Sequence, residues 1–149
     1  MRALGVDYGR KRVGLALSDA SGMLARPWKT LAVAGIDRQV AELTREVEAL
    51  AAESDGLAVI VIGWPRRLSG DPNEQTAAVE RLAARLRTHT PVPIVLQDER
   101  LTSHEAEELL SKKEKDWRKR KLQLDAVAAA VILQDYLDAL PSRTLEPEP

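Results

Sequence analysis

Three acidic residues lie beside apolar sequence, where a carboxylate is costly to bury. Asp7 and Glu99 each follow a short apolar run, and Asp125 lies in the alanine-rich region 122–140. A buried carboxylate requires a hydrogen-bond donor, a counter-ion or a metal ion. Taken singly, each of these acids is more typical of a helix cap or a salt bridge than of catalysis.

Taken together, the three acids indicate a metal site. An Asp on a first strand, an acid at the end of a later strand and an Asp on the last helix can converge at one edge of a sheet. Three neighbouring carboxylates repel one another unless a cation lies among them. Oxygen ligands suit Mg²⁺ or Mn²⁺, and two such ions can assist an in-line phosphoryl displacement. We therefore predict that Asp7, Glu99 and Asp125 are catalytic and bind metal, and that the reaction is phosphodiester hydrolysis.

Composition limits the classes of protein that remain. The 149 residues suit one domain, predicted at 1–140, and the proline-containing tail 141–149 is predicted to be disordered. The absence of cysteine excludes disulfides, thiolate nucleophiles and cysteine-based zinc sites. The sequence shows neither an apolar run of bilayer length nor a signal peptide, so we predict a cytoplasmic protein without a membrane partner.

Hydrophobic periodicity predicts the elements that must position the acids. Alternation or continuous apolar runs predict strands at 3–8, 12–18, 23–31, 57–63 and 94–96. Helical spacing and capping signals predict helices from Asp37, at 72–89, behind Thr102 and at 122–140. An antiparallel meander followed by alternating helix and strand predicts an α/β fold with a mixed sheet and helices on both faces. The ribonuclease H-like architecture has this order of elements.

Three segments resemble the signatures of one protein family. Residues 5–19 read GVDYGRKRVGLALSD, residues 98–102 read DERLT, and residues 125–129 with 132–137 read DAVAA and ILQDYL. In this order, and from residue 4 to 137, they resemble the RuvX/YqgF family of Holliday junction resolvases and pre-16S rRNA nucleases. The resemblance implies the ribonuclease H-like fold and a metal-binding triad of Asp7, Glu99 and Asp125. Adjacent strand residues face opposite sides, so we assign Glu99 to the metal and give Asp98 a structural or supporting role.

Basic residues near these segments are candidates for nucleic-acid contacts. The segment 112–121 carries seven basic and two acidic residues around Trp117, and the first hairpin and the loop after residue 63 add further basic residues. Such residues can hold phosphates, and an aromatic ring can stack on a base, although a solvated charged surface explains the same pattern. The predicted contacts are Arg10, Lys11, Arg66, Arg67, Lys113, Trp117, Arg118, Lys119, Arg120 and Lys121. The loop 63–70 departs from the family pattern at Trp64 and at residues 68–69, which bears on substrate details and not on the fold.

Several functions are compatible with this pattern. The preferred one is a metal-dependent nuclease that processes the 5′ end of pre-16S rRNA or acts on branched nucleic acid. A Holliday junction resolvase acting on DNA would need two active sites, so the chain is expected to be a monomer or a homodimer. A non-catalytic ribosome assembly factor would use the basic segment alone. An actin-like or sugar-kinase-like ATPase would need a second, duplicated domain, of which the sequence shows no trace.

Overall fold

The computed structural model describes residues 1–65, 74–99 and 117–141, with the side chains of 117–123 left out. Its elements, in chain order, are β1 (Arg2–Tyr8), β2 (Val13–Ser18), β3 (Ala25–Leu31), α1 (Ile36–Ala52), β4 (Leu57–Pro65), α2 (Glu74–Arg87), β5 (Ile94–Glu99) and α4 (Trp117–Ala139). All five predicted strands are confirmed, as are the helices predicted from Asp37, at 72–89 and at 122–140. The helix predicted behind Thr102 and the tail 142–149 lie outside the described residues.

The last helix starts earlier than predicted. The apolar pattern places its beginning at residue 122, whereas α4 begins at Trp117. The added turn consists mainly of Arg and Lys, which have high helix propensity and extend a helix without needing an apolar face. The second half of the basic segment 112–121 is therefore helical.

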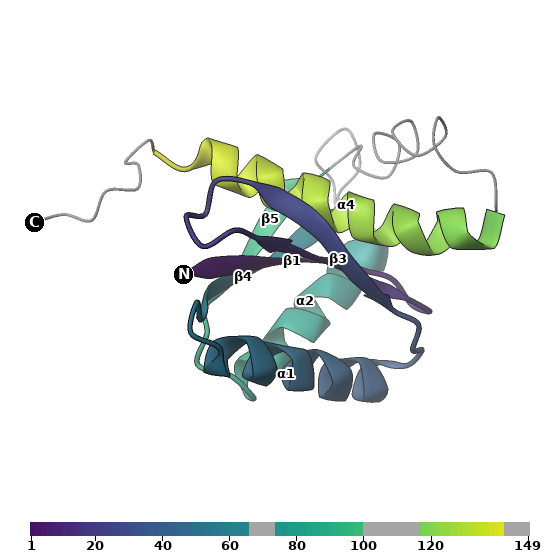
Figure 1. The fold of residues 1–149 in the computed structure, drawn as a ribbon. Coiled ribbons are helices and arrows are strands. Elements are labelled where there is room, and N and C mark those ends of the chain that lie inside the picture. Colours follow the sequence, from purple (N-terminus) through teal and green to yellow (C-terminus); the bar gives the residue numbers. More distant parts are fainter. Residues whose placement is uncertain (66–73, 100–116, 142–149) are drawn as a thin grey trace, which may run out of the picture.

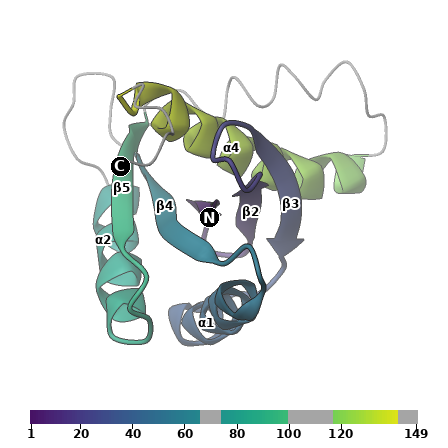
Figure 2. The same cartoon turned by 60° about the vertical axis from the view of Figure 1, so that its left-hand side comes forward.

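The five strands form one mixed sheet in the order β3-β2-β1-β4-β5. Strands β1, β2 and β3 pair antiparallel, while β4 and β5 continue from β1 in parallel. Helices α1 and α2 cover one face and α4 covers the other (Figures 1 and 2). The predicted α/β class with helices on both faces is thus confirmed. The carboxyl ends of β1, β4 and β5 lie at the same edge of the sheet.

The two faces of the sheet have different cores. In β1, Leu4 and Val6 point to the α1 and α2 side, whose larger core includes Leu43, Ile62 and Leu82. The opposite face holds a smaller core with Ala129, Ile132 and Leu133 of α4. Within the described residues, no helix is long and apolar enough to cross a membrane.

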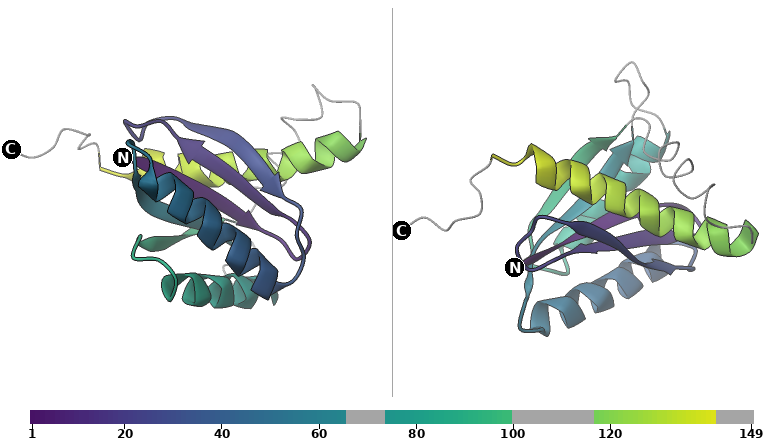
Figure 3. Two further views of the ribbon diagram at one scale, coloured as in Figure 1. Left: turned by 60° about the horizontal axis from the view of Figure 1, so that its bottom comes forward. Right: turned by 45° about the horizontal axis from the view of Figure 1, so that its top comes forward.

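Helix α4 lies against β1, β2 and β3 at close range (Figure 3). A Cβ atom added at Gly14 of β2 would overlap the backbone carbonyl of Asp125. At Gly5 of β1, an added Cβ would lie 2.8 Å from the carbonyl oxygen of Ala129. Glycine at these positions therefore sets how near Asp125 comes to the sheet.

We expect Gly14→Ala to lower the free energy of unfolding by about 1–3 kcal/mol, because the new methyl group meets backbone that cannot rotate away. Chemical denaturation would measure the loss. Gly22→Ala is the control: Gly22 has φ 74° and nothing within 4 Å of an added Cβ. It should cost only backbone strain, about 1 kcal/mol. Equal losses in the two variants would contradict close packing of α4 at Gly14.

Candidate active site

Asp7 and Asp125 are brought together by the packing of α4 on the sheet. Asp7 and Ala3 are separated by an even number of positions in β1, so their side chains point to the same face of the sheet. Ala3 belongs to the core under α4. Its partner in β2 is Gly14, the residue over which the Asp125 backbone passes. The two carboxylates therefore lie on one face of the sheet, near the carboxyl end of β1.

The surroundings of Asp7 disfavour its ionised form. Burial, and secondly the charge of Asp125, raise the pKa of Asp7 from its ordinary value of 3.8 to about 7. A carboxyl group with such a pKa exchanges its proton near neutral pH, and a bound cation would favour its ionised form. The pair has the chemistry of a cation site.

Arg12 is the cation that the structure provides. Its Nε donates a hydrogen bond to Oδ2 of Asp125 at 2.6 Å, and the two side chains are 28% and 20% exposed. The contact fixes the orientation of the Asp125 carboxylate and balances its charge. This role of Arg12 could not be predicted from the sequence, because only the position of α4 over β2 brings these two residues together.

Glu99 and Asp98 face opposite sides of the sheet. Glu99 pairs with Pro65 of β4, and Pro65 shares its alternation with Val61, which belongs to the core under α4. Asp98 pairs with Trp64, whose Nε1 donates to Glu80 of α2 on the other side. Glu99 is half-buried and Asp98 is exposed. Glu99 is thus the member of the acidic pair on the same face as Asp7 and Asp125.

The three predicted ligands do not form a ready-made cluster. Among the residues that the structure describes, no group of three acidic or histidine side chains is placed to hold one ion. Asp7 and Asp125 are close, while Glu99 ends a strand that is separated from β1 by β4. Glu99 shares their face and their edge of the sheet without joining the pair.

Of the residues predicted to contact nucleic acid, the structure describes the side chains of two, which lie near this edge of the sheet. Arg10 and Lys11 are exposed in the hairpin between β1 and β2. Gln39 of α1, fully buried, supports that hairpin by donating through Nε2 to the carbonyls of Gly9 and Val33, both at 2.9 Å. The supporting role of Gln39 was not predicted from the sequence, because a polar residue in an amphipathic helix is usually exposed.

The structure describes the backbone of residues 117–121, the second half of the basic segment. Residues 117–121 form the first turn of α4, and Figure 1 shows this end of the helix on the same side of the molecule as the β1 to β2 hairpin. The side chains of Trp117, Arg118, Lys119, Arg120 and Lys121 are not described. Arg66, Arg67 and Lys113 lie outside the described residues.

The raised pKa of Asp7 predicts a pH-dependent stability in metal-free protein. The unfolded chain loses this proton near pH 4, whereas the native state holds it until about pH 7, so ionisation favours unfolding across that interval. We expect the free energy of unfolding of the wild type to fall by about 4 kcal/mol relative to Asp7→Asn between these limits. Urea denaturation across this pH range, with chelator present, measures the difference. A constant difference between the two proteins would contradict the raised pKa.

The chain is similar to known proteins over nearly its full length. A family model described as RuvX, Holliday junction resolvase, matches residues 1–139. A protein of Geobacillus kaustophilus named "Putative pre-16S rRNA nuclease" is 39% identical over 139 residues, covering 93% of this chain and 99% of that protein. A protein of the same name from Syntrophus aciditrophicus is 41% identical over 140 residues, covering 94% and 90%.

The fold has a counterpart among solved structures. RuvC of T. thermophilus, in complex with a Holliday junction substrate, matches with a TM-score of 0.51 at 16% identity, covering 93% of this chain and 94% of that chain. This likeness confirms the predicted ribonuclease H-like fold.

Proposed function

The chain belongs to the RuvX family, and we propose that it is a nuclease that hydrolyses phosphodiester bonds in nucleic acid with a divalent metal ion as cofactor. The observation that carries this proposal is the pairing of Asp7 with Asp125 under α4. Burial, and secondly the charge of Asp125, disfavour the ionised form of Asp7, and a cation bound between the two carboxylates would offset this cost.

The donor atoms suit Mg²⁺ or Mn²⁺. Asp7 and Asp125 would hold the ion, and Glu99, on the same face and edge, would complete the set of carboxylate ligands. One or two such ions would supply Lewis-acid stabilisation of the attacking and leaving oxygens of the phosphodiester.

Arg12 and Gly14 hold Asp125 in position at this site. Arg12 holds the Asp125 carboxylate in one orientation through the 2.6 Å hydrogen bond from its Nε. The packing of α4 on Gly14 of β2 sets how near Asp125 comes to the sheet. Such supporting contacts commonly decide ligand orientation and metal affinity.

We favour a precursor of 16S rRNA as the substrate, cut at its 5′ end. Two relatives that are about 40% identical over nearly their whole length are each named "Putative pre-16S rRNA nuclease". The basic first turn of α4 extends past the hairpin on the side of the carboxylates, where it would meet phosphates. We expect the reaction in the cytoplasm, by a monomer or a homodimer.

A second candidate is resolution of Holliday junctions in DNA recombination and repair. The description of the family model favours it. Symmetric cutting of a four-way junction requires two active sites, so this activity would need a homodimer.

The test is a cleavage assay of the full-length protein with Mg²⁺, Mn²⁺ or chelator. The substrates are a labelled precursor of 16S rRNA, an unstructured RNA and a four-way DNA junction. We expect metal-dependent cleavage, with the rRNA precursor cut fastest. Faster cutting of the junction would instead assign the resolvase activity. Nucleic-acid binding without cleavage of any substrate would overturn the proposal and leave a non-catalytic ribosome assembly factor.

A further inference from the structure

A concave surface lies on the other face of the sheet from the carboxylate pair. A pocket of about 970 Å³ is formed by Tyr8 at the end of β1, Arg10 of the hairpin and the first half of α2. Asp7 and Tyr8 are consecutive, so their Cα atoms are about 3.8 Å apart while their side chains point to opposite faces. The pocket therefore opens at the same edge of the sheet as the candidate active site.

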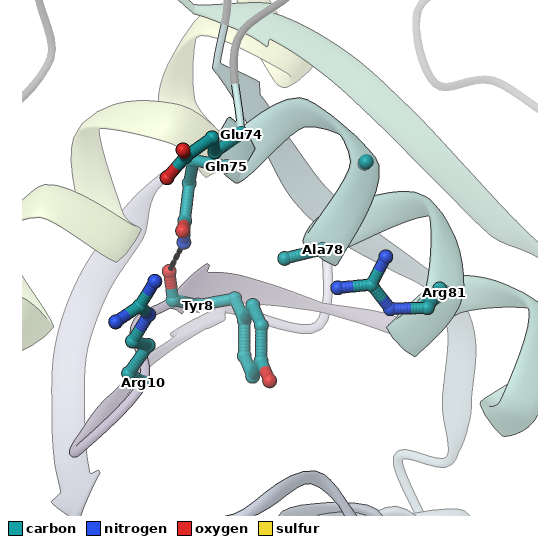
Figure 4. Close-up of a pocket in the computed structure, with 7 residues that line it drawn as sticks. Tyr8, Arg10, Glu74, Gln75, Ala78 and Arg81 are labelled. Atoms are coloured by element: carbon teal, nitrogen blue, oxygen red, sulfur yellow. Dashed lines mark hydrogen bonds between the residues drawn. The ribbon is translucent and has the colours of Figure 1, made fainter.

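The pocket combines an aromatic ring with two positive charges. In Figure 4 the guanidinium groups of Arg10 and Arg81 lie on either side of the half-buried Tyr8 ring. Within the described part of the chain, neither arginine forms a salt bridge. Both arginines are exposed, so their charges are available to an anion at the mouth of the pocket.

Helix α2 holds the ring in place. Nε2 of Gln75 donates to the backbone carbonyl of Tyr8 at 2.7 Å, which ties the end of β1 to the helix. The Tyr8 side chain also packs against the core under α1 and α2. A ring fixed in this way loses little freedom when a ligand stacks on it. Glu74 adds one negative charge at the end of the pocket near Gln75, so an anionic group is favoured between the two arginines and away from Glu74.

We propose that this pocket binds one unpaired nucleotide of a single-stranded RNA or DNA substrate, adjacent to the phosphodiester that is cut. The base stacks on Tyr8, and its phosphate lies between Arg10 and Arg81. Stacking on a fixed aromatic ring requires a base that is free of its partner strand. Guanidinium groups match the geometry of phosphate oxygens. The assignment of this nucleotide as part of a substrate rests on the proposed nuclease function, while the binding itself does not.

The test measures binding of a short, fluorescently labelled single-stranded RNA by anisotropy, with chelator present to prevent cleavage. Tyr8→Leu should weaken binding about tenfold, and Tyr8→Phe, which keeps the ring, should stay within about twofold of the wild type. Arg81→Ala should weaken binding and lower the slope of log affinity against log salt by about 0.7, whereas Tyr8→Leu should leave that slope unchanged. Arg45→Ala on α1, whose side chain is 72% exposed, is the matched control and should change neither quantity.

A second variant protects the test against misfolding of Tyr8→Leu. Ala78 lines the same pocket from α2, so Ala78→Phe should fill it and weaken binding as much as Tyr8→Leu. Wild-type affinity in Arg81→Ala and Ala78→Phe would overturn the proposal. Equal binding of fully paired RNA would also overturn it. So would effective competition by a free mononucleotide at the same concentration as the RNA strand. Either result would show that the pocket does not select an unpaired strand.

The two proposals fail separately. Metal-dependent cleavage with unchanged binding by the pocket variants would remove the nucleotide site and keep the nuclease. Binding that depends on Tyr8 and Arg81, without cleavage of any substrate, would keep the nucleotide site and remove the nuclease.

Discussion

Asp7→Asn is expected to lower the rate of metal-dependent cleavage by at least about a thousandfold, equivalent to about 4 kcal/mol of transition-state stabilisation. The amide keeps the shape of the side chain and loses the charge that holds a cation. The same substitution removes the cost of a buried charge and, secondly, the repulsion from Asp125, so the metal-free variant should be more stable than the wild type near neutral pH. Activity and stability thus move in opposite directions, which separates a lost ligand from a damaged fold.

Single-turnover cleavage and urea denaturation measure the two effects on the same preparations. Asp19→Asn is a suitable control, because Asp19 belongs to the same sequence segment and lies beyond the other end of β2. Its carboxylate accepts hydrogen bonds from Ser21 and from the backbone of Met23 and Leu24, which hold its pKa at about 2. Asp19→Asn should leave the cleavage rate within about threefold of the wild type. A comparable loss in both variants would contradict a special role for Asp7.

Glu99→Gln is expected to lower cleavage by about a hundredfold or more, while Asp98→Asn should change it by less than about threefold. The difference follows from the pairing of β5 with β4, which directs Glu99 to the face of α4 and Asp98 to the face of α2. Because the two residues are adjacent and both substitutions replace a carboxylate with an amide, the comparison isolates the direction of the side chain.

The measurement for this pair is the cleavage rate at increasing Mn²⁺ concentration. A ligand variant should need more Mn²⁺ to reach half of its maximal rate, whereas a variant that only affects stability should not. Loss of cleavage in Asp98→Asn with normal cleavage in Glu99→Gln would reverse the assignment within the acidic pair.

Periodic segments made most of the fold predictable. The continuous apolar run at 57–63 predicts a central strand, and β4 lies between β1 and β5. The alternation of Val13, Leu15 and Leu17 predicts β2 in the same way. These patterns report burial directly, because each strand contacts a helix on at least one face.

Contacts between distant segments could not be read from the same patterns. The ion pair of Arg12 with Asp125 joins residues 113 positions apart, and it depends on where α4 crosses β2. Gly14 permits this crossing, yet a glycine in a strand is equally typical of a bulge. For the acidic pair at 98–99, alternation shows that only one side chain can share the face of Asp7 and Asp125, and the register with β4 adds which face each one takes.

The pocket on the α2 side could not be predicted from the sequence either. Tyr8 and Arg10 belong to the first signature segment, but Arg81 is one of three arginines in α2, and nothing in the sequence separates it from the other two. Only the position of α2 against the end of β1 brings Arg81 beside the Tyr8 ring. A pocket that is assembled from separate elements in this way could not be predicted from the sequence alone.

The most direct test of the central claim is a titration of the full-length protein with Mn²⁺, in which the free ion is followed by its electron paramagnetic resonance signal. We predict that the wild type and Asp19→Asn bind Mn²⁺ alike, and that Asp7→Asn binds at least about tenfold more weakly. Equal Mn²⁺ binding by the wild type and Asp7→Asn would contradict a metal site at Asp7 and Asp125.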